Sequence, residues 1–258
     1  MLLTIDAGNT NIALGLMDGD RVVGTFRLIT KTPRTSDEFV MCFNEFFGTQ
    51  GFRKEDVEDT IISSVVPKVN YALSSAVIKY FGKMPIIINK DTDTGVSLDM
   101  PNPSEVGADL IVDCAMAYLC YQRPCIIIDF GTATTYTYVS GDGHFPYVAI
   151  QPGLRTSADA LTGQAAQLPE IEIRKPETVL GYNTVTAMQA GIMYGYIGSV
   201  EYIIRAMKEE LNEPDCYVIA TGGLGRAMSE ATDLIDEYDP DVAYKGMYRI
   251  YQRIKKTV

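Results

Sequence analysis

The chain has 258 residues, of which 22 are Lys or Arg and 33 are Asp or Glu, so its formal net charge is −11. Because 47% of the residues are apolar, the length and composition favour one large domain or two moderate ones and exclude a disordered or fibrous chain. The excess of acidic residues argues against a nucleic-acid-binding surface, which requires clustered Lys and Arg.

Strand and helix patterns alternate along the chain, which predicts an α/β fold with partly parallel sheets. No Pro-rich or Ser-rich linker occurs near residue 120, where we expect the boundary between two closely packed lobes, residues 1–119 and 120–258. The strand patterns lie at residues 2–5, 21–29, 60–66, 84–88, 125–128, 147–150 and 216–220, and the helical patterns at residues 37–47, 70–81, 104–118 and 184–211.

Two segments repeat one short pattern, residues 5–10 (IDAGNT) and 128–134 (IDFGTAT). In each, a β-rich apolar run ends with Asp and the chain then turns through Gly and small polar residues. An alternating run, a hairpin signal and a further strand pattern follow in both cases. The repetition predicts two halves of similar build.

The turn after each strand-end Asp is a candidate phosphate site. Consecutive backbone N–H groups in such a turn point toward one position, and Asp6 or Asp129 can hold a hydrated divalent cation beside the phosphate. A single turn of this kind is more often an ordinary β-turn. Because the pattern occurs twice, phosphate binding and an ordinary turn become about equally good interpretations. A third glycine-rich turn, residues 221–225 (TGGLG), suits an adenosine-binding surface, although one Gly-Gly after a strand is weak evidence.

Glu105, Asp109 and Asp113 recur at helical spacing and would form one acidic stripe. A solvated helix face is the simpler interpretation. Apolar residues mark the adjoining stripe and Gly107 allows close approach, so a catalytic carboxylate is the alternative.

The five Cys residues contain no CxxC pair, and an odd number does not describe a disulfide framework. Residues 1–6 have no basic segment and end in a carboxylate, unlike a secretion signal. The longest weakly polar stretch, residues 190–200, is too short for a membrane span. We therefore expect a cytoplasmic protein with reduced thiols and no membrane anchor.

Eight segments along the chain carry a resemblance to one known family: IDAGNTNIALG (5–15), SSVVP (63–67), NPSEVGAD (102–109), IDFGTATT (128–135), IQPGL (150–154), AAQLP (165–169), GYNTVTAMQAG (181–191) and TGG (221–223). Over nearly its full length the chain resembles the type III pantothenate kinases, members of the acetate and sugar kinase/Hsp70/actin superfamily. The resemblance implies two ribonuclease H-like, actin-like lobes with mixed β-sheets flanked by helices. It also implies ATP-dependent phosphorylation of pantothenate to 4′-phosphopantothenate, the first step of coenzyme A synthesis.

The resemblance implies a role for individual residues. Asp109 would be the general base, Asp129 would hold a monovalent cation (K⁺ or NH₄⁺), and Asp6 would lie near the Mg²⁺ that accompanies ATP. The ATP-binding residues would be Asp6, Ala7, Gly8, Asn9, Thr10, Asn11, Ile12, Ala13, Thr132, Gly222 and Gly223. The substrate-binding residues would be Met100, Gly107, Ala108, Asp109, Leu110 and Thr184.

The sequence departs from the family pattern around the expected active site. Leu110 stands where the family carries Arg, and loss of one charge-assisted contact in the transition state is expected to cost about 2 to 4 kcal/mol. Arg155 is a candidate replacement for that positive charge. The other departures are Met100 for an aromatic residue, Asp113 for Asn, Tyr147 and Val148 for Gly-Gly, and Gln167 for Lys.

Two functions stay open at this point. The first is an ATP:pantothenate phosphotransferase, which in the family works as a homodimer with its substrate pocket at the subunit interface. The second is a catalytically weakened homologue that binds nucleotide or pantothenate and serves as a regulatory or partner subunit, paired with a complete paralogue. Retention of Asp6, Asp109, Asp129 and Thr132 favours the enzyme, and the departures favour the partner subunit.

Overall fold

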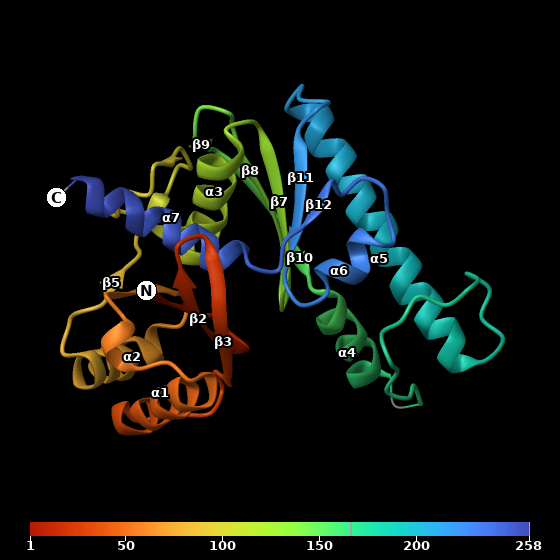
Figure 1. Ribbon diagram of the computed structural model, residues 1–258. Helices are drawn as coiled ribbons and strands as arrows, with labels where there is room; N and C mark the ends of the chain where they lie inside the picture. The colour runs from red at the N-terminus through yellow and green to blue at the C-terminus, as the bar shows by residue number, and fades with distance from the viewer. Residues whose placement is uncertain (166, 258) are drawn as a thin grey trace. The chain divides into compact units, whose positions relative to one another are not determined.

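The computed structural model describes residues 1–165 and 167–257; Ala166, which belongs to the AAQLP segment, and Val258 lie outside the described residues. By its internal contacts the chain divides into two units, whose elements are labelled in Figure 1. The expected lobe boundary near residue 120 stays a prediction. Unit 1 comprises Met1–Gln122, Gly143–Pro146 and Asp241–Val258, and unit 2 comprises Arg123–Asp142 and Tyr147–Pro240.

Unit 1 contains a mixed five-stranded sheet in the order β3-β2-β1-β4-β5. The first three strands are antiparallel neighbours, whereas β4 runs parallel to β1, and β5 runs parallel to β4. The central strand is largely buried on both faces because helices cover both sides of the sheet. The strands are β1 (Leu2–Ala7), β2 (Asn11–Asp18), β3 (Arg21–Ile29), β4 (Asp59–Ser64) and β5 (Ile86–Ile87).

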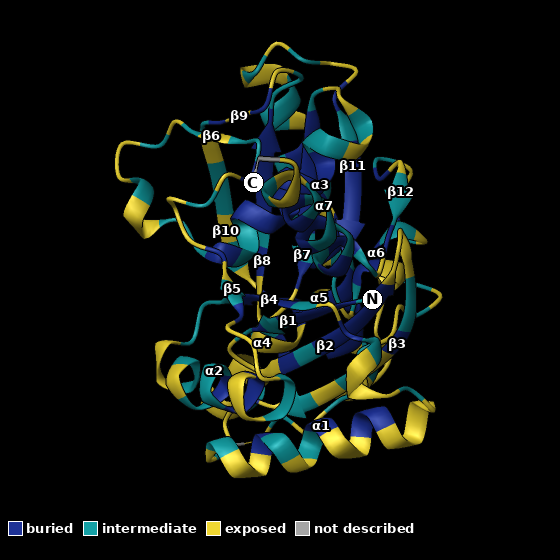
Figure 2. Cartoon of the chain, turned by 60° about the vertical axis from the view of Figure 1, so that its left-hand side comes forward, coloured by how far each residue is buried: buried dark blue, intermediate teal, exposed yellow. Residues whose placement is uncertain are grey.

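The helices of unit 1 bury two separate apolar clusters against this sheet. Helices α1 (Ser36–Gln50) and α2 (Pro67–Phe81) pack on the face that carries Leu3 and Ile5. Figure 2 shows α1 buried toward the sheet and exposed on its outer side. Helices α3 (Ala108–Tyr121) and α7 (Val242–Thr257) pack on the face that carries Leu2.

Unit 2 repeats this arrangement in the order β10-β8-β7-β11-β12, with the same antiparallel and parallel neighbours. Helix α5 covers one face with Met193, Ile197 and Val200. The predicted α/β class, with two mixed sheets flanked by helices, is therefore confirmed. The elements are β7 (Cys125–Phe130), β8 (Ala133–Val139), β10 (Tyr147–Pro152), α4 (Leu154–Gln164), α5 (Thr184–Glu210), β11 (Tyr217–Thr221), α6 (Gly225–Ser229) and β12 (Glu237–Tyr238).

Short elements complete unit 1. Strands β6 (Ser97–Leu98) and β9 (His144–Phe145) form a two-stranded parallel pair, and His144 Nδ1 is hydrogen-bonded to Asp99 Oδ2 beside it. Two 3₁₀ turns occur, η1 (Lys54–Asp56) and η2 (Pro103–Glu105). In the part of the chain that the structure describes, no helix has the length and apolar content that would let it cross a bilayer.

The solvated-face interpretation of the acidic stripe is wrong. The predicted helix at residues 104–118 begins only at Ala108, because Gly107 is extended and separates α3 from the 3₁₀ turn that contains Glu105. Glu105 therefore does not share a helix face with Asp109, and Asp113 is only 6% exposed. A solvated face does not describe these acids.

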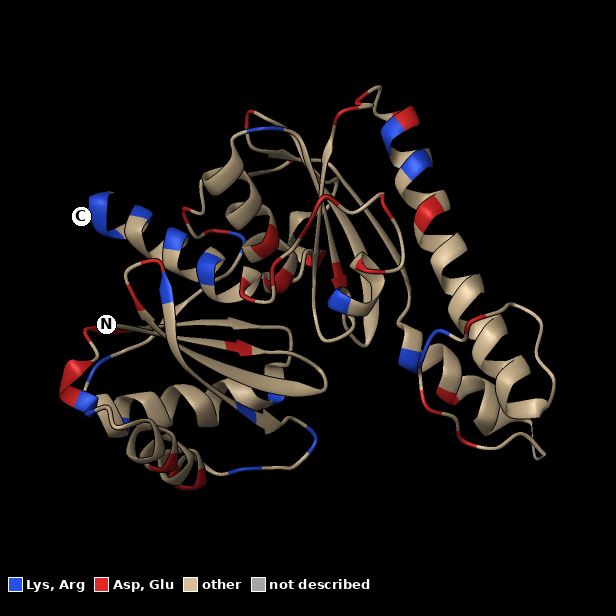
Figure 3. Cartoon of the chain, turned by 45° about the vertical axis from the view of Figure 1, so that its right-hand side comes forward, with Lys and Arg blue, Asp and Glu red and all other residues tan. Residues whose placement is uncertain are grey.

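The sequence patterns did not predict α4, α6 or α7. Helix α7 carries Lys and Arg along its length (Figure 3), and these charges obscure an apolar spacing at Met247, Ile250 and Tyr251 that buries the helix against α3. Its basic residues are also engaged, since Lys255 Nζ lies 2.8 Å from Asp59 Oδ2.

Candidate active site

The turn after β1 is held in place by hydrogen bonds from Thr30, the residue that follows β3. Gly8 N–H donates to Asn11 O at 2.9 Å and closes the turn. Thr30 Oγ1 donates to Gly8 O at 2.7 Å, and Thr30 N–H donates to Thr10 O at 2.9 Å. A Cβ atom at Gly8 would stand 3.3 Å from Asn11 O, so a larger residue would crowd the turn. The expected phosphate-binding backbone is therefore rigid.

The residues of this turn differ in what they can offer a ligand. Asn9, Thr10 and Asn11 are exposed, whereas the side chains of Ala7 and Ile12 lie fully in the core. Ala7 and Ile12 can therefore contact a ligand only through backbone groups.

Asp109 occupies the first turn of α3. Its Oδ1 accepts a hydrogen bond from Leu110 N–H at 2.8 Å, so the carboxylate satisfies one of the N–H groups that lack a partner within the helix. Burial raises the pKa of Asp109 above its ordinary value, against the opposing effect of the N–H groups of Leu110 and Asp109 itself. A raised pKa strengthens a carboxylate as a base.

Gly107 makes room for this carboxylate. A Cβ at Gly107 would collide with the Asp109 carboxylate and would stand 3.2 Å from Val65 Cγ1. Val65 in turn donates its N–H to Ala7 O at 3.1 Å. Val65 therefore links the end of β1 to the start of α3, and unit 1 brings the predicted residues 6–13 and 107–110 into one neighbourhood.

Two site residues were missed by the sequence patterns, Arg27 and Tyr244. Asp6, Ala13 and Arg27 are register partners across β1, β2 and β3, so their side chains share one face of the sheet. Tyr244 of α7 is buried beside them and hydrogen-bonds the Arg27 side chain. Burial raises the pKa of Tyr244, Arg27 lowers it and Asp6 raises it further. The alternation of β3 could have indicated the face of Arg27, but only packing identifies Tyr244.

In unit 2, Asp129 is the penultimate residue of β7 and lies between two glycine turns. The Cβ position of Gly131 lies 3.6 Å from Asp129 Oδ2. A Cβ at Gly222 would collide with the Asp129 carboxylate and would stand 2.7 Å from Phe130 N, and Gly222 also has a φ of +84°. Only glycine fits this position, so the predicted residues Asp129 and Gly222 come together, with Gly223 next in the chain.

Thr132 is held by the start of α4. Its carbonyl accepts hydrogen bonds from Gly153 N–H at 3.0 Å and from Thr156 Oγ1 at 2.7 Å. A Cβ at Gly153 would stand only 2.6 Å from Thr132 O, so the close approach requires glycine. Arg155, which is exposed, lies in the same helical turn. The hydrogen bonds of Gly153 and Thr156 thus bring the backbone of this turn to Thr132.

The remaining predicted substrate residues lie on separate elements. Met100 follows β6 in unit 1 and is half-buried, and Ala108 is buried at the start of α3. Thr184 is exposed at the first position of α5 in unit 2, where Asn183 Oδ1 accepts a hydrogen bond from Thr186 N–H at 3.0 Å. The predicted residues are thus divided between the two units.

The oxygen atoms around the turns that follow Asp6 and Asp129 suit a cation that is also coordinated by phosphate. Among residues 1–165 and 167–257, no group of three or more His, Cys, Asp or Glu could hold a metal by itself. Asp6 and Asp129 each add one carboxylate to nearby backbone and hydroxyl oxygens. Hard cations such as Mg²⁺ are commonly bound by one or two carboxylates together with substrate phosphates.

Comparison with known proteins gives a consistent result. The family profile described as "Type III pantothenate kinase" matches residues 2–206. A type III pantothenate kinase of Agathobacter rectalis is 48% identical over 253 residues, which cover 98% of this chain and 97% of that protein. One of Bifidobacterium longum is 47% identical over the same number of residues, with coverage of 98% and 99%.

Solved structures with lower identity share the fold. A conserved putative Baf family transcriptional activator from Campylobacter jejuni aligns with a TM-score of 0.59 at 17% identity, over 98% of this chain and 99% of that chain. Component A of (R)-2-hydroxyglutaryl-CoA dehydratase from Acidaminococcus fermentans aligns with a TM-score of 0.53 at 14% identity, over 100% and 99%.

Proposed function

Because the chain belongs to the type III pantothenate kinase family, it transfers phosphate from ATP to pantothenate in coenzyme A synthesis, and we propose that Asp109 is the general base of this reaction. The enzyme uses ATP together with a divalent metal. The observation that carries the proposal for Asp109 is its place at the start of α3, with a pKa raised by burial. A base must come within about 3 Å of the hydroxyl proton, or reach it through one water.

The phosphates of ATP are proposed to bind the turn at residues 6–13 and the turn at Thr132. Phosphoryl transfer depends mainly on alignment and charge neutralisation, which rigid backbone N–H groups can provide. The hydrogen bonds from Thr30, Gly153 and Thr156 support this proposal, because they hold both turns in place. Gly222 and Gly223 are proposed to face the adenosine.

Two cations complete the proposed site, Mg²⁺ near Asp6 and a monovalent cation, K⁺ or NH₄⁺, at Asp129. Bound cations of this kind neutralise the charge of the polyphosphate. The glycine turns around Asp129 support the second position, since they bring backbone groups close to its carboxylate. Asp6 and Asp129 would hold these ions while Arg27 adds positive charge on the face of Asp6.

Pantothenate is proposed to contact Met100, Gly107, Ala108, Asp109, Leu110 and Thr184. Leu110 provides no donor for a carboxylate or phosphate. Arg155 is proposed to replace part of the missing positive charge, and its exposed position in the first turn of α4 supports this.

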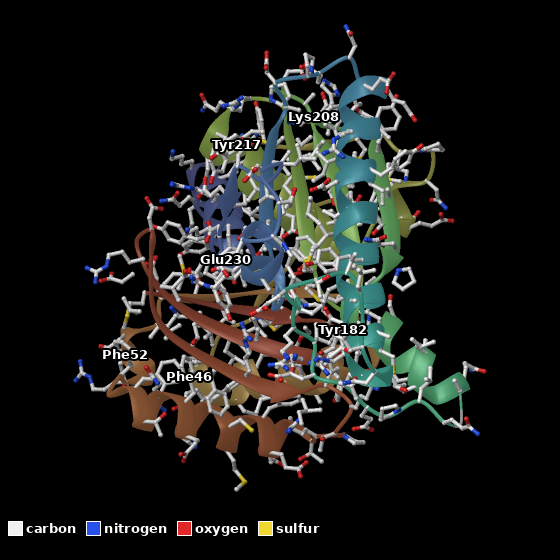
Figure 4. The ribbon with its side chains drawn as sticks, turned by 90° about the vertical axis from the view of Figure 1, so that its right-hand side faces the viewer. Phe46, Phe52, Tyr182, Lys208, Tyr217 and Glu230 are labelled. Carbon is white, nitrogen blue, oxygen red and sulfur yellow. The ribbon has the colours of Figure 1, made fainter. Side chains whose placement is uncertain are left out.

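We further propose that the protein is a cytoplasmic homodimer formed through unit 2. Strand β10 is at the edge of its sheet and exposes Ile150 at 64%, and edge strands favour pairing with another chain. Along α5, Tyr202 is 73% exposed, and Tyr182, labelled in Figure 4, is 87% exposed just before the helix begins. A heteromer with a paralogue is the other arrangement, but the comparisons give no support to a weakened partner subunit.

The test is an assay of the purified chain alone with ATP, Mg²⁺ and pantothenate, with and without K⁺ or NH₄⁺. We expect equal amounts of ADP and phosphopantothenate, and faster turnover when the monovalent cation is present. Product formation only after addition of a complete paralogue would contradict the homomeric enzyme. Turnover unaffected by the monovalent cation would contradict the proposed site at Asp129.

A further inference from the structure

Three side-chain oxygens in the described part of the chain are buried without a hydrogen-bond partner: Ser63 Oγ, Thr135 Oγ1 and Thr137 Oγ1. Buried hydroxyls normally have a partner, because leaving one unsatisfied is unfavourable. Two of the three, Ser63 and Thr135, are register partners of the acids of the duplicated turns on the adjacent strands. Chance burial is therefore a poor explanation.

In unit 1, Ser63 on β4 is the register partner of Asp6 on the parallel neighbour β1. Side chains of such partners point to the same face of the sheet, and the strands are about 4.8 Å apart. A serine hydroxyl and an aspartate carboxylate can meet across this distance at about 2.7 Å. Ser63 is only 1% exposed, so Asp6 is a suitable acceptor for its proton.

In unit 2, Thr135 on β8 is the register partner of Asp129 on the antiparallel neighbour β7. The same geometry therefore recurs beside the second acid, although the hydroxyl comes from the opposite neighbour. Asp6 and Asp129 each already have an interaction within the protein. A bond to the hydroxyl thus requires the carboxylate to turn, and a bound ligand can cause that turn.

We propose that Ser63 and Thr135 are positioning residues for Asp6 and Asp129. When ATP and its cations bind, each carboxylate accepts a hydrogen bond from the hydroxyl across the strand, and the bond selects the carboxylate oxygen that faces the ligand. This inference rests on the proposed function, because it assigns ATP and cations to the two turns. It extends that function to residues outside both turns.

The test measures ATP affinity by isothermal titration calorimetry of the full chain in Mg²⁺ and K⁺. We expect Ser63→Ala and Thr135→Val to weaken ATP binding about tenfold, since bonds to charged groups are among the stronger ones. Without ligand, the unfolding temperature of both variants should equal or exceed that of the unsubstituted protein, because each replaces a partnerless hydroxyl. Ser63→Thr keeps the hydroxyl and should bind ATP within about threefold of the unsubstituted protein.

The chain offers a matched control for each variant. Ser64→Ala alters the next residue of β4, whose hydroxyl donates to Asn70 Oδ1 at 2.5 Å. Thr137→Val removes the third partnerless hydroxyl, which lies opposite Ile127 and has no acid across the strand. Both controls should bind ATP within about twofold of the unsubstituted protein.

Three results separate the possibilities. If Ser63→Ala and Thr135→Val bind ATP as the controls do, the inference is wrong. It is also wrong if these variants lose stability without ligand, because the hydroxyls would then be structural. If the unsubstituted protein itself fails to bind ATP, the proposed function fails first and the inference falls with it.

Discussion

At the scale of single residues, ionised Asp109, the candidate base, lowers the stability of the folded state. A carboxylate whose pKa is raised in the folded state binds its proton more tightly there than in the unfolded chain. Its contribution to stability is therefore full at low pH and is lost as the pH rises through the folded pKa. Asp109 is thus kept at a position where the ionised form is unfavourable, as expected for a group that serves chemistry.

Asp109→Asn tests this assignment. We expect turnover to fall by about 10² to 10⁴, the usual contribution of a positioned acid or base. In the unsubstituted enzyme, kcat/KM should rise with pH through an acid limb that lies above the ordinary range for Asp, and the variant should lack that limb. At neutral pH the unfolding temperature of the variant should be unchanged or higher. A variant that keeps full turnover would show that another group takes the proton.

Leu110→Arg tests the departure from the family pattern at the next position. If missing positive charge limits catalysis, the added guanidinium should raise kcat/KM for pantothenate by about 30-fold or more. Leu110→Lys is the control, because an ammonium cannot form the two-pronged contact that Arg makes with a carboxylate or phosphate. An unchanged rate in the Arg variant would mean that Arg155, Arg27 or another group already supplies the charge.

At the scale of elements, the last helix, α7, covers one face of the sheet in unit 1. Helix α7 covers the sheet face that also carries Asp6, and it brings Tyr244 to the Arg27 side chain. Gly246 allows this close packing, since a Cβ there would meet Val112 Cγ1 at 2.7 Å. The site in unit 1 therefore depends on a segment far from its motifs in the sequence.

Ile250→Ala tests the contribution of α7 to stability. Ile250 is fully buried in the cluster shared by the sheet, α3 and α7, so we expect a loss of about 2 to 5 kcal/mol in the free energy of unfolding. Urea denaturation gives this value, with Lys256→Ala on the exposed side of the same helix as the control. Equal stability of the two variants would mean that α7 is not firmly docked.

At the scale of the whole molecule, the two sheets are built to one plan. Both have five strands in the same order with the same directions, and in both the central strand carries Asp as its penultimate residue. The candidate base Asp109 lies in unit 1, and the proposed ligand-binding residues come from both units.

The proposed homodimer is tested by sedimentation equilibrium of the purified chain. We expect a dimer mass at micromolar concentration, and a shift toward the monomer for Ile150→Glu and Tyr202→Glu. Tyr71→Glu is the matched control, because Tyr71 is 85% exposed but lies on α2 of unit 1. If all three variants keep the dimer mass of the unsubstituted chain, the proposal of dimerisation through unit 2 is wrong.

The α/β class, the duplication and the strand-end acids were all predictable from the sequence. These features are local, because a buried strand, the Asp near its end and the glycine turn occupy consecutive residues. Their apolar periodicity can therefore be recognised in the sequence. The residue type at Gly107 also pointed to close approach, although not to which atoms approach.

Only the tertiary structure decided which distant groups meet. The end of the acidic stripe at Gly107, the docking of α7, the Tyr244 contact with Arg27, and the hydroxyls of Ser63 and Thr135 across from the acids all depend on strand register and on packing between segments far apart in the chain. Periodicity specifies which face of an element is buried. It does not specify what covers that face, because this depends on the free energy of the assembled core.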